Sequence, residues 1–441
     1  MSEGHQFRLL RQRRYAPFFW TVFLGTLNDN LLKFAVTLLL TYQVSLAWLP
    51  PAVVGPATGA LFILPSLLLS ATAGQWADKW PLDRLIRAGK ALEVAMMLLA
   101  AWAVWQREPW TLLGCLLLSG IHVTVFSTLK YAYVPRHLDE PELVGGNGLL
   151  EMGMFTAILL GSLVGGLLVA PREWWPGLPM GVEETALPLA LVVLALLGWW
   201  RAQAIPMTAA VDPELHVHLN PIGETWRNLQ RASAHGQVLW SLLGISWMWF
   251  FGAVFLSLFP ALTHDTLKAP SSVASLLLVL ISLGIGSGAL MCERLARGHS
   301  PLRLVPLGAL GMAVFGGDLA WSVMQLEQGQ GLPTGGWHLQ AILGEVALWR
   351  LLADVWLMAM SVGWFSVPLY AHMQAQSEPS HRARIVGANN ILNAVFILLS
   401  AALAWGLGAA GLSYGQVFAA TIALHLLACG LAWRILRAQN R

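Results

Sequence analysis

The sequence predicts an all-α integral membrane protein of twelve transmembrane helices, arranged as two pseudo-symmetric six-helix bundles. Three observations lead to this prediction. Hydrophobic residues make up 56% of the 441 residues and charged residues 11%, less than half of the roughly 25% that is usual in soluble domains. Apolar runs long enough to cross a bilayer recur along the chain. Two stretches in different halves of the chain also resemble each other.

This internal repeat relates the stretch that begins at Phe126 to the one that begins at Phe365. Four residues recur at a spacing of 239 positions: Phe126 and Phe365, Ser127 and Ser366, Tyr131 and Tyr370, Ala132 and Ala371. After the following loop the spacing becomes 242, where Gly145 and Asn147 return as Gly387 and Asn389. A period of this length indicates two halves, each forming one structural unit.

Twelve segments are apolar over the roughly 20 residues that a helix needs to cross a bilayer core. They run approximately over 16–42, 52–76, 86–105, 110–130, 147–170, 186–205, 238–262, 271–292, 302–325, 346–373, 386–410 and 414–435. The longest connection follows the sixth segment and is polar and rich in proline. We therefore expect an N-terminal bundle at 1–205, a cytoplasmic linker at 206–237 and a C-terminal bundle at 238–441.

The distribution of Lys and Arg predicts the orientation. With the N-terminus in the cytoplasm, 21 of the 26 Lys and Arg residues lie on the cytoplasmic side, and only Arg107, Arg172 and Lys268 lie on the outer side. Cytoplasmic loops carry such an excess of positive charge in multi-pass proteins. An even number of spans then places both termini in the cytoplasm.

Composition and motifs exclude several functions. The net charge of +3 is dispersed among short loops, so we expect no nucleic-acid partner. Cys115, Cys292 and Cys429 lie in or beside apolar runs without CxxC spacing, so we expect neither a disulfide nor a metal site. Walker A, HExxH and HxxxxD motifs are missing from the sequence. We expect a protein that is not an enzyme and binds no cofactor.

The first segment contains GTLNDNLLKF, which places Asn28, Asp29, Asn30 and Lys33 inside the membrane. Charges at this depth are costly and by default functional. Asp29 and Lys33 are four residues apart, so one alternative is a self-neutralised pair. Three successive polar residues do not fit on one helix stripe. We therefore expect this turn to face a wet cavity, where Asp29 contacts a polar or cationic part of a substrate.

Polar residues also flank the fourth, fifth and eleventh segments. Lys130 lies where the fourth segment meets the cytoplasm, and is either a positive-inside anchor or an anion contact. Asn147 and Glu151 share a face at the start of the fifth segment, and Asn389 occupies the equivalent turn of the eleventh. We favour gating contacts between the two halves for these turns. The alternative for Glu151 is an ion pair with Lys130 or with a basic residue of the loop in the same motif.

A charged motif, GQWADKWPLDR, joins the second and third segments. Charge pairs at this place can hold neighbouring helix ends together on the cytoplasmic side and release when they separate; the alternative is a solvated loop. The residues to which we assign this gating role are Gly74, Asp78, Lys79, Asp83 and Arg84.

Spacing along helices assigns further intramembrane charges. Glu93 lies one turn after Lys90 and is expected to be its partner. Arg350 and Asp354 are four residues apart and are expected to pair near the outer surface. Asp318 has no evident partner and is left unassigned.

Taken together, these motifs resemble the major facilitator superfamily. GQWADKWPLDR is similar to the superfamily's motif between spans 2 and 3, although Trp80-Pro81 replaces the usual small-residue turn. LGTLNDNLLKF, STLKYAYVPRHL and ELVGGNGLLEMGMFTAILLGSLVGG resemble, more specifically, the lysophospholipid transporter family. The resemblance covers nearly the whole chain and is strongest from 120 to 170.

The resemblance implies that lysophosphatidylethanolamine or lysophosphatidylglycerol is moved from the outer to the inner leaflet of the bacterial inner membrane, for re-acylation in the cytoplasm. It implies functional roles for Asp29, Asn30 and Lys130. An acyltransferase and acyl-carrier-protein synthetase, fused to some members, would here be a separate partner. The family's arginine in the seventh span is missing, because residues 247–260 carry no charge.

Physically, a single-chain lipid suits these residues. Asp29 can meet an ammonium, and Lys130 or Lys33 a phosphate. A phenylalanine series in the seventh span either lines an acyl-chain wall or is ordinary packing: Phe250, Phe251, Phe255 and Phe259. Two alternative functions stay open. One is an exporter of small amphipathic solutes or drugs with Asp29 as its proton-coupling site, and the other is a membrane scaffold that transports nothing.

Overall fold

The computed structural model describes residues 5–42, 44, 51–169, 182–234, 236–267, 269, 271–296, 300–329 and 346–439. Every regular element in these ranges is a helix. Arg172 and Lys268, which we placed in outer loops, lie outside the described residues. The prediction of an all-α protein is confirmed.

Packing divides the chain into two compact units. Unit 1 consists of Met1–Asp139, Thr156–Arg231 and Ser377–Ile391. Unit 2 consists of Glu140–Phe155, Ala232–Gln376 and Leu392–Arg441. Two helices pass from one unit into the other: α6 (Leu143–Val169) and α14 (Arg382–Ala409).

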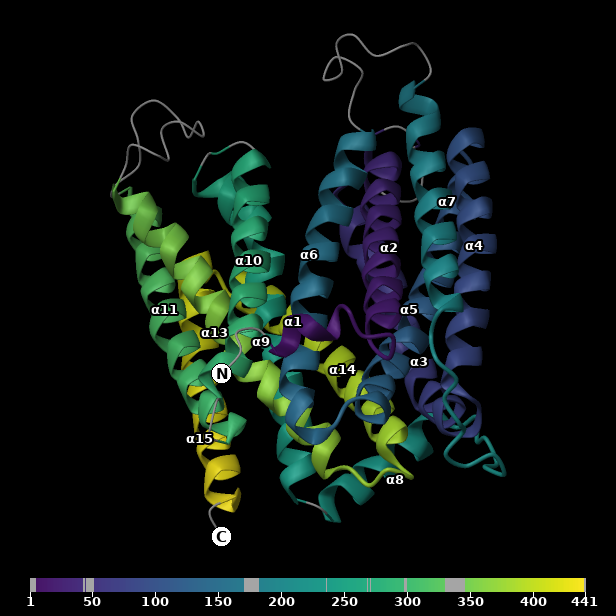
Figure 1. The fold of residues 1–441 in the computed structure, drawn as a ribbon. Helices are drawn as coiled ribbons and strands as arrows, with labels where there is room; N and C mark the ends of the chain where they lie inside the picture. The colour runs from purple at the N-terminus through teal and green to yellow at the C-terminus, as the bar shows by residue number, and fades with distance from the viewer. Residues whose placement is uncertain are drawn as a thin grey trace. The chain divides into compact units, whose positions relative to one another are not determined.

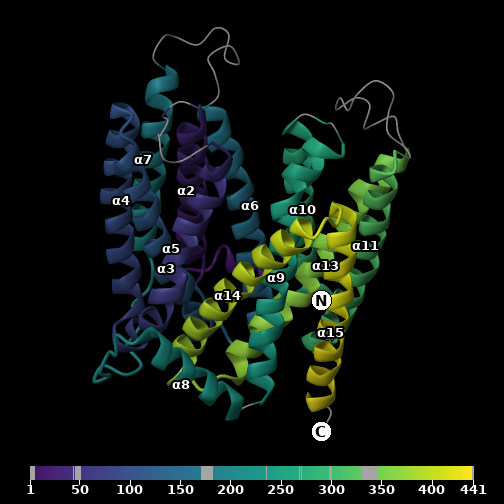
Figure 2. The same cartoon turned by 180° about the vertical axis from the view of Figure 1, so that it is seen from behind.

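Unit 1 is built on long helices whose apolar faces meet in one core. α4 and α7 lie side by side in both views (Figures 1 and 2), and α2 packs against α7, α3 and α5. Leu32, Met97, Leu116 and Leu191 contribute to this core and are almost inaccessible to solvent. The helices assigned to this unit are α1 (His5–Leu9), α2 (Ala16–Tyr42), α3 (Pro51–Lys79), α4 (Leu82–Gln106), α5 (Pro109–His137), α7 (Val182–Gln203) and most of α8 (Pro221–Ala234).

Unit 2 is organised around α13, which packs against α9, α10 and α11. A Cβ on Gly284 of α10 would lie 2.6 Å from the carbonyl oxygen of Trp356 of α13, so this glycine lets the two backbones approach closely. The elements assigned to this unit are η1 (Glu140–Glu142), α9 (Gly236–Asp265), α10 (Ser271–Leu295), η3 (Pro301–Arg303), α11 (Leu304–Glu327), α13 (Val346–Gln376) and α15 (Tyr414–Gln439).

The phenylalanine series of α9 belongs to the core of unit 2. Phe251, Phe255 and Phe259 are each at most 1% exposed, and the rings of Phe255 and Phe418 stack with their centroids 4.5 Å apart. Phe250 is 6% exposed and stacks on Trp247. These residues pack on aromatic neighbours of their own unit, which favours the packing alternative over an acyl-chain wall.

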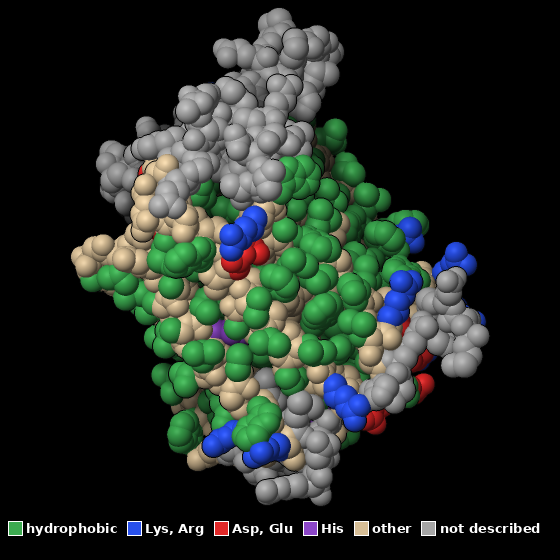
Figure 3. Space-filling view, turned by 90° about the vertical axis from the view of Figure 1, so that its left-hand side faces the viewer, with side chains coloured by type: hydrophobic (Ala, Val, Ile, Leu, Met, Phe, Trp, Pro, Cys, Tyr) green, Lys and Arg blue, Asp and Glu red, His purple; other side chains and the backbone are tan. Residues whose placement is uncertain are grey.

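The helices are long and apolar enough to cross a membrane. Eleven of the described helices meet this requirement by length and composition, and Tyr414–Gly430 is a shorter apolar helix. The outer face of α11 carries an exposed apolar stripe, and hydrophobic side chains cover much of the described surface in Figure 3. The stripe consists of Leu307, Leu310, Val314 and Trp321. Large apolar surfaces of this kind face lipid in membrane proteins.

Candidate functional site

A cavity of about 60 Å³ lies inside unit 1, among α2, α4 and α5. Four of its lining residues are ionisable: Asp29, Lys90, His122 and Lys130. All four side chains are buried. The cavity is large enough for a few water molecules. The sequence predicted a wet cavity beside Asp29, and the structure places a cavity there.

Asp29 is held by α5 rather than by its own helix. Its Oδ1 accepts a 2.7 Å hydrogen bond from Ser119 Oγ, and its Oδ2 lies 3.6 Å from His122 Nδ1. In the part of the chain that the structure describes, no hydrogen bond or ion pair joins Asp29 to Lys33. The Lys33 ammonium lies 5.0 Å from the centroid of the Phe62 ring. The two residues therefore do not form the self-neutralised pair that their spacing allows.

The two asparagines beside Asp29 are not among the residues that line the cavity. Asn28 Nδ2 donates to the carbonyl oxygen of Leu191 on α7 at 3.0 Å and to Glu93 Oε1 at 3.4 Å. Asn30 Nδ2 donates to the carbonyl oxygen of Thr26 in the preceding turn at 2.8 Å. The expectation that the whole polar turn faces the cavity is wrong, because the Asn28 amide group donates to neighbouring helices and the Asn30 amide group to its own helix, and neither residue lines the cavity. Their predicted roles in substrate binding stay predictions.

Lys90 and Glu93 form the predicted ion pair. Both side chains are completely buried, and Lys90 Nζ donates to Glu93 Oε2. A Cβ on Gly25 would collide with the Lys90 side chain, so this glycine makes room for the lysine. Lys90, which is one of the 21 residues counted on the cytoplasmic side, lies fully buried within the bundle.

Sequence analysis missed His122, which completes this group of ionisable residues. Its Nε2 lies 3.4 Å from Glu93 Oε2, while Nδ1 faces Asp29. The side chain is 5% exposed, and neither ring nitrogen makes a hydrogen bond within the described residues. The signal was a histidine in the middle of the apolar run LLLSGIHVTVF. We call Asp29, Lys90, Glu93 and His122 the His122 cluster.

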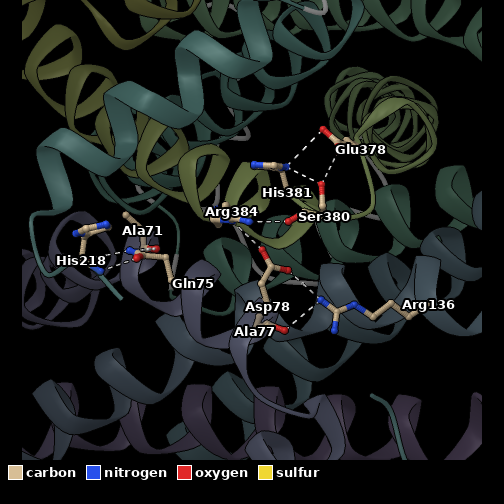
Figure 4. Close-up of polar contacts among 10 residues, drawn as sticks. All are labelled: Ala71, Gln75, Ala77, Asp78, Arg136, His218, Glu378, Ser380, His381 and Arg384. Atoms are coloured by element: carbon tan, nitrogen blue, oxygen red, sulfur yellow. Dashed lines mark hydrogen bonds and ion pairs between the residues drawn. The ribbon is translucent and has the colours of Figure 1, made fainter. Parts of the chain in front are cut away.

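A second buried acid lies at the end of α3. Asp78 Oδ1 accepts a 3.1 Å hydrogen bond from Arg136 Nη2, and Oδ2 accepts a 3.0 Å bond from Arg384 Nε (Figure 4). Arg384 also donates to the carbonyl oxygen of Ser380 at 2.7 Å. Since the carboxylate is fully buried, the solvated-loop alternative is wrong for this residue. We call Asp78, Arg136 and Arg384 the Asp78 cluster.

The partners of Asp78 come from distant parts of the sequence and not from its own loop. Arg136 ends α5, and Arg384 begins α14 in the opposite half of the chain. Within the described residues, neither Lys79 nor Arg84 forms an ion pair, and Arg84 is exposed. Within the described residues, Asp78 of the charged motif therefore makes ion pairs with other helices, whereas Lys79 and Arg84 do not.

Gly74 lies where α3 approaches the start of α14 closely. A Cβ at this position would lie 2.9 Å from the carbonyl oxygen of Ala383 and 2.9 Å from Arg384 Cα. Such distances require the backbones to move apart. The glycine in the motif is thus needed for the contact that brings Arg384 to Asp78.

The connection after α7 is tied to the same end of unit 1. Gln75 Nε2 donates to the carbonyl oxygen of His218 at 2.9 Å, and the His218 amide donates to Gln75 Oε1 at 2.7 Å (Figure 4). Asp83 Oδ1 accepts a 3.0 Å hydrogen bond from the Thr208 amide. Asp83 therefore binds the linker backbone, and the solvated alternative is wrong for it too.

The repeated polar turns make separate contacts in the two units. In unit 2, Asn147 and Gln374 exchange side-chain hydrogen bonds of 2.7 and 3.2 Å, and Glu151 is buried. In unit 1, Asn389 is fully buried, and Asn390 Nδ2 donates to Ser127 Oγ at 2.8 Å. The gating role assigned to these turns stays a prediction.

Arg350 pairs with a residue that spacing did not assign. Arg350 Nε of α13 donates a 2.9 Å hydrogen bond to Asp318 Oδ2 of α11. Within the described residues no hydrogen bond or ion pair joins Arg350 to Asp354, although the two charges interact electrostatically, so the ion pair that forms is not the expected one. The packing of α11 against α13 supplies a partner that a pattern within one helix does not contain.

The fold and the buried charges inside it define a class of protein. Residues 18–401 match the family model of the Major Facilitator Superfamily. The chain belongs to this superfamily of membrane transporters. It is 27% identical to the lysophospholipid transporter LplT of Klebsiella pneumoniae, over 91% of this chain and 92% of that protein. It is 25% identical to LplT of Serratia proteamaculans, over 84% and 81%.

Solved structures show the same fold at low sequence identity. The human organic anion transporter MFSD10 (TETRAN) matches with a TM-score of 0.69 and 16% identity, over 98% of this chain and 100% of that chain. A bacterial homologue of the iron transporter ferroportin matches with a TM-score of 0.65 and 14% identity, over 95% and 98%.

Proposed function

We propose that this protein moves lysophosphatidylethanolamine and lysophosphatidylglycerol from the outer to the inner leaflet of the bacterial inner membrane by alternating access. Both termini would lie in the cytoplasm, where a separate acyltransferase and acyl-carrier-protein synthetase would re-acylate the product. The similarity to LplT proteins over 91% of the chain supports this proposal. The protein would act as a transporter and not as an enzyme.

The observation that carries the proposal is the buried carboxylate of Asp29 beside a cavity. One of its oxygens accepts a hydrogen bond from Ser119. The other makes no hydrogen bond in the described structure and faces His122. A carboxylate of this kind can accept a charge-assisted hydrogen bond from the ammonium of an ethanolamine head group. Lys130 lines the same cavity and would contact the phosphate. The acyl chain would need only an apolar surface.

Transport would require unit 1 to open around this site. A cavity of about 60 Å³ holds water but not a head group. The Asp78 cluster joins the start of α14 to α3 and α5, so its release would free a helix that continues into unit 2. Residues 1–205 and 238–441 would then rock against each other, with 206–237 as the linker between them.

The test is reconstitution into liposomes with labelled lysophosphatidylethanolamine and the substitution Asp29→Asn. We expect uptake to fall about tenfold or more, because the substitution removes a charged hydrogen bond of about 1.5–3 kcal/mol to the head group. Glu214→Gln is the matched control, since Glu214 is an exposed acid of the linker. The control should transport at the rate of the unmodified protein.

Three outcomes would contradict the proposal in different ways. Undiminished transport by Asp29→Asn would remove the assigned role of Asp29. Competition by hydrophobic cations without any transport of lysolipid would favour an exporter of amphipathic solutes. Transport of neither class of compound would favour a membrane scaffold.

A further inference from the structure

The ring of His122 lies between two carboxylates. Nδ1 is 3.6 Å from Asp29 Oδ2 on α2, and Nε2 is 3.4 Å from Glu93 Oε2 on α4. A carboxylate oxygen of an ionised acid accepts hydrogen bonds and donates none. Each nitrogen of this buried ring therefore faces a group that can only accept a proton.

A neutral imidazole does not match these neighbours. It carries one N–H and one lone pair, so one of its nitrogens must direct a lone pair at a carboxylate. An imidazolium carries two N–H groups and can donate to both Asp29 and Glu93. Each carboxylate also has other donors. Ser119 donates to the oxygen of Asp29 that does not face the ring, whereas Lys90 donates to the same Glu93 Oε2 that faces the ring, and Asn28 donates to Glu93 Oε1. Neither Ser119 nor Lys90 makes a hydrogen bond to the His122 ring in the described structure. A proton added to His122 would give both ring nitrogens an N–H group, and each could then donate to the carboxylate that it faces.

The surrounding charges decide what a proton would do to the cavity. Asp29 comes from α2, Lys90 and Glu93 from α4, and Lys130 from the same helix as His122. The formal charges of these two acids and two lysines sum to zero, so the region is neutral when His122 is neutral. A proton on His122 raises the formal charge of the region to +1. Within the described residues, α3 adds no charged side chain to the cavity lining and α7 adds only the Leu191 carbonyl beside Asn28.

We propose that His122 is a proton-dependent selector of the lipid head group. This inference rests on the proposed function. With His122 neutral, Asp29 Oδ2 can accept the ammonium of an ethanolamine head group. With His122 protonated, the imidazolium donates to that oxygen and the cavity gains a positive charge. The ammonium is then opposed, while a head group with a phosphate and no amine is attracted.

Histidine suits this role because its ordinary titration lies between pH 5 and 8. A primary alkyl amine keeps its proton over that range. The charge of the ethanolamine head group therefore stays constant over this range. The preference between the two lipids becomes a direct measure of the protonation of the site.

The experiment compares lysophosphatidylethanolamine with lysophosphatidylglycerol of the same acyl chain. Kd and uptake are measured for each at about pH 5 and about pH 7.5, for the full-length protein, for His122→Gln and for His216→Gln. His216 is an exposed histidine of the linker and is the control. We expect the preference for lysophosphatidylethanolamine to rise about tenfold at the higher pH, since a unit charge at hydrogen-bonding distance is worth at least that much.

His122→Gln should give the same preference at both pH values, whereas His216→Gln should retain the change. A preference that does not change with pH in the unmodified protein overturns the inference, and so does a change that persists in His122→Gln. If His122→Gln does not fold, His122→Asn and the unmodified protein decide. Failure of the proposed function is distinct, because neither lysolipid would then bind or cross at any pH.

Discussion

Unit 1 contains two buried clusters of charged residues. The clusters differ in how completely the hydrogen-bonding groups within them are paired. In the Asp78 cluster, one acid accepts hydrogen bonds from two arginines, one to each oxygen. In the His122 cluster, Lys90 pairs with Glu93 alone, and both acids face a histidine whose nitrogens make no hydrogen bond in the described structure. Only the His122 cluster borders the cavity.

We propose that this difference separates a structural contact from a binding site. A buried charge that is fully paired stabilises one arrangement of its helices, and its removal leaves the partners without compensation. A buried ring with two unsatisfied nitrogens has capacity for a proton or for a ligand nearby. On this basis we assign the Asp78 cluster to holding helix ends together and the His122 cluster to binding.

The largest effect is expected for Lys90→Met. This substitution leaves Glu93 buried without its cation and should cost about 3–5 kcal/mol of stability. The double substitution Lys90→Met with Glu93→Gln should recover a large part of this loss, because it removes both charges. Chemical denaturation of the purified protein in detergent measures both variants. Lys79→Met, at a lysine without an ion pair, should change stability by less than about 0.5 kcal/mol.

If the double variant were no more stable than Lys90→Met, the charge of Glu93 would not be the cause of the loss. The His122 cluster would then have to be interpreted through packing. The two clusters would then no longer differ for electrostatic reasons.

An intermediate effect is expected for Arg384→Gln. Loss of one charged hydrogen bond to Asp78 should cost about 1.5–3 kcal/mol and loosen the start of α14. Ser70 of α3 is fully buried where α14 passes at Gly387. A cysteine introduced by Ser70→Cys should therefore be alkylated about tenfold faster in the Arg384→Gln background. Arg84→Gln, at an exposed arginine without an ion pair, is the control and should leave the rate unchanged.

An equal alkylation rate in Arg384→Gln and in its control would show that the Asp78 cluster does not hold α14 against α3. The gating role assigned to the motif would then have to be abandoned.

The smallest effect is expected for Gly74→Ala. The added Cβ forces α3 and the start of α14 apart, at a cost of about 1–3 kcal/mol. Gly59→Ala in the same helix is the matched control, because a Cβ there meets no atom within 4 Å. It should be neutral or slightly stabilising, since alanine favours a helix. Thermal unfolding in detergent compares the two, and equal melting temperatures would contradict the close approach at Gly74.

The secondary structure and the pairs within one helix were largely predictable. Apolar runs predicted the helices, and a spacing of three residues predicted the pair of Lys90 with Glu93. The same logic failed for Arg350, whose partner Asp318 lies on another helix. Local spacing describes which residues share a helix face, but it contains no information about which helix packs against that face.

The residues of the candidate site were predictable only in part. Asp29 and Lys130 were identified because a charge in an apolar run is costly. His122 was missed because no sequence pattern relates it to Asp29 or to Glu93. The directions in which Asn28 and Asn30 point depend on the neighbours available to each amide.

The sequence by itself determined that this chain is helical, lies in a membrane, repeats internally and carries charges inside its apolar segments. Hydrophobicity and periodicity act along the chain, so they can be read from it. Only the tertiary structure decided how the charges other than the Lys90–Glu93 pair are compensated, because their partners lie on other helices that can be distant in the sequence. The contacts of Asp78 with Arg136 and Arg384, and of His122 with Asp29 and Glu93, exist only once the helices pack.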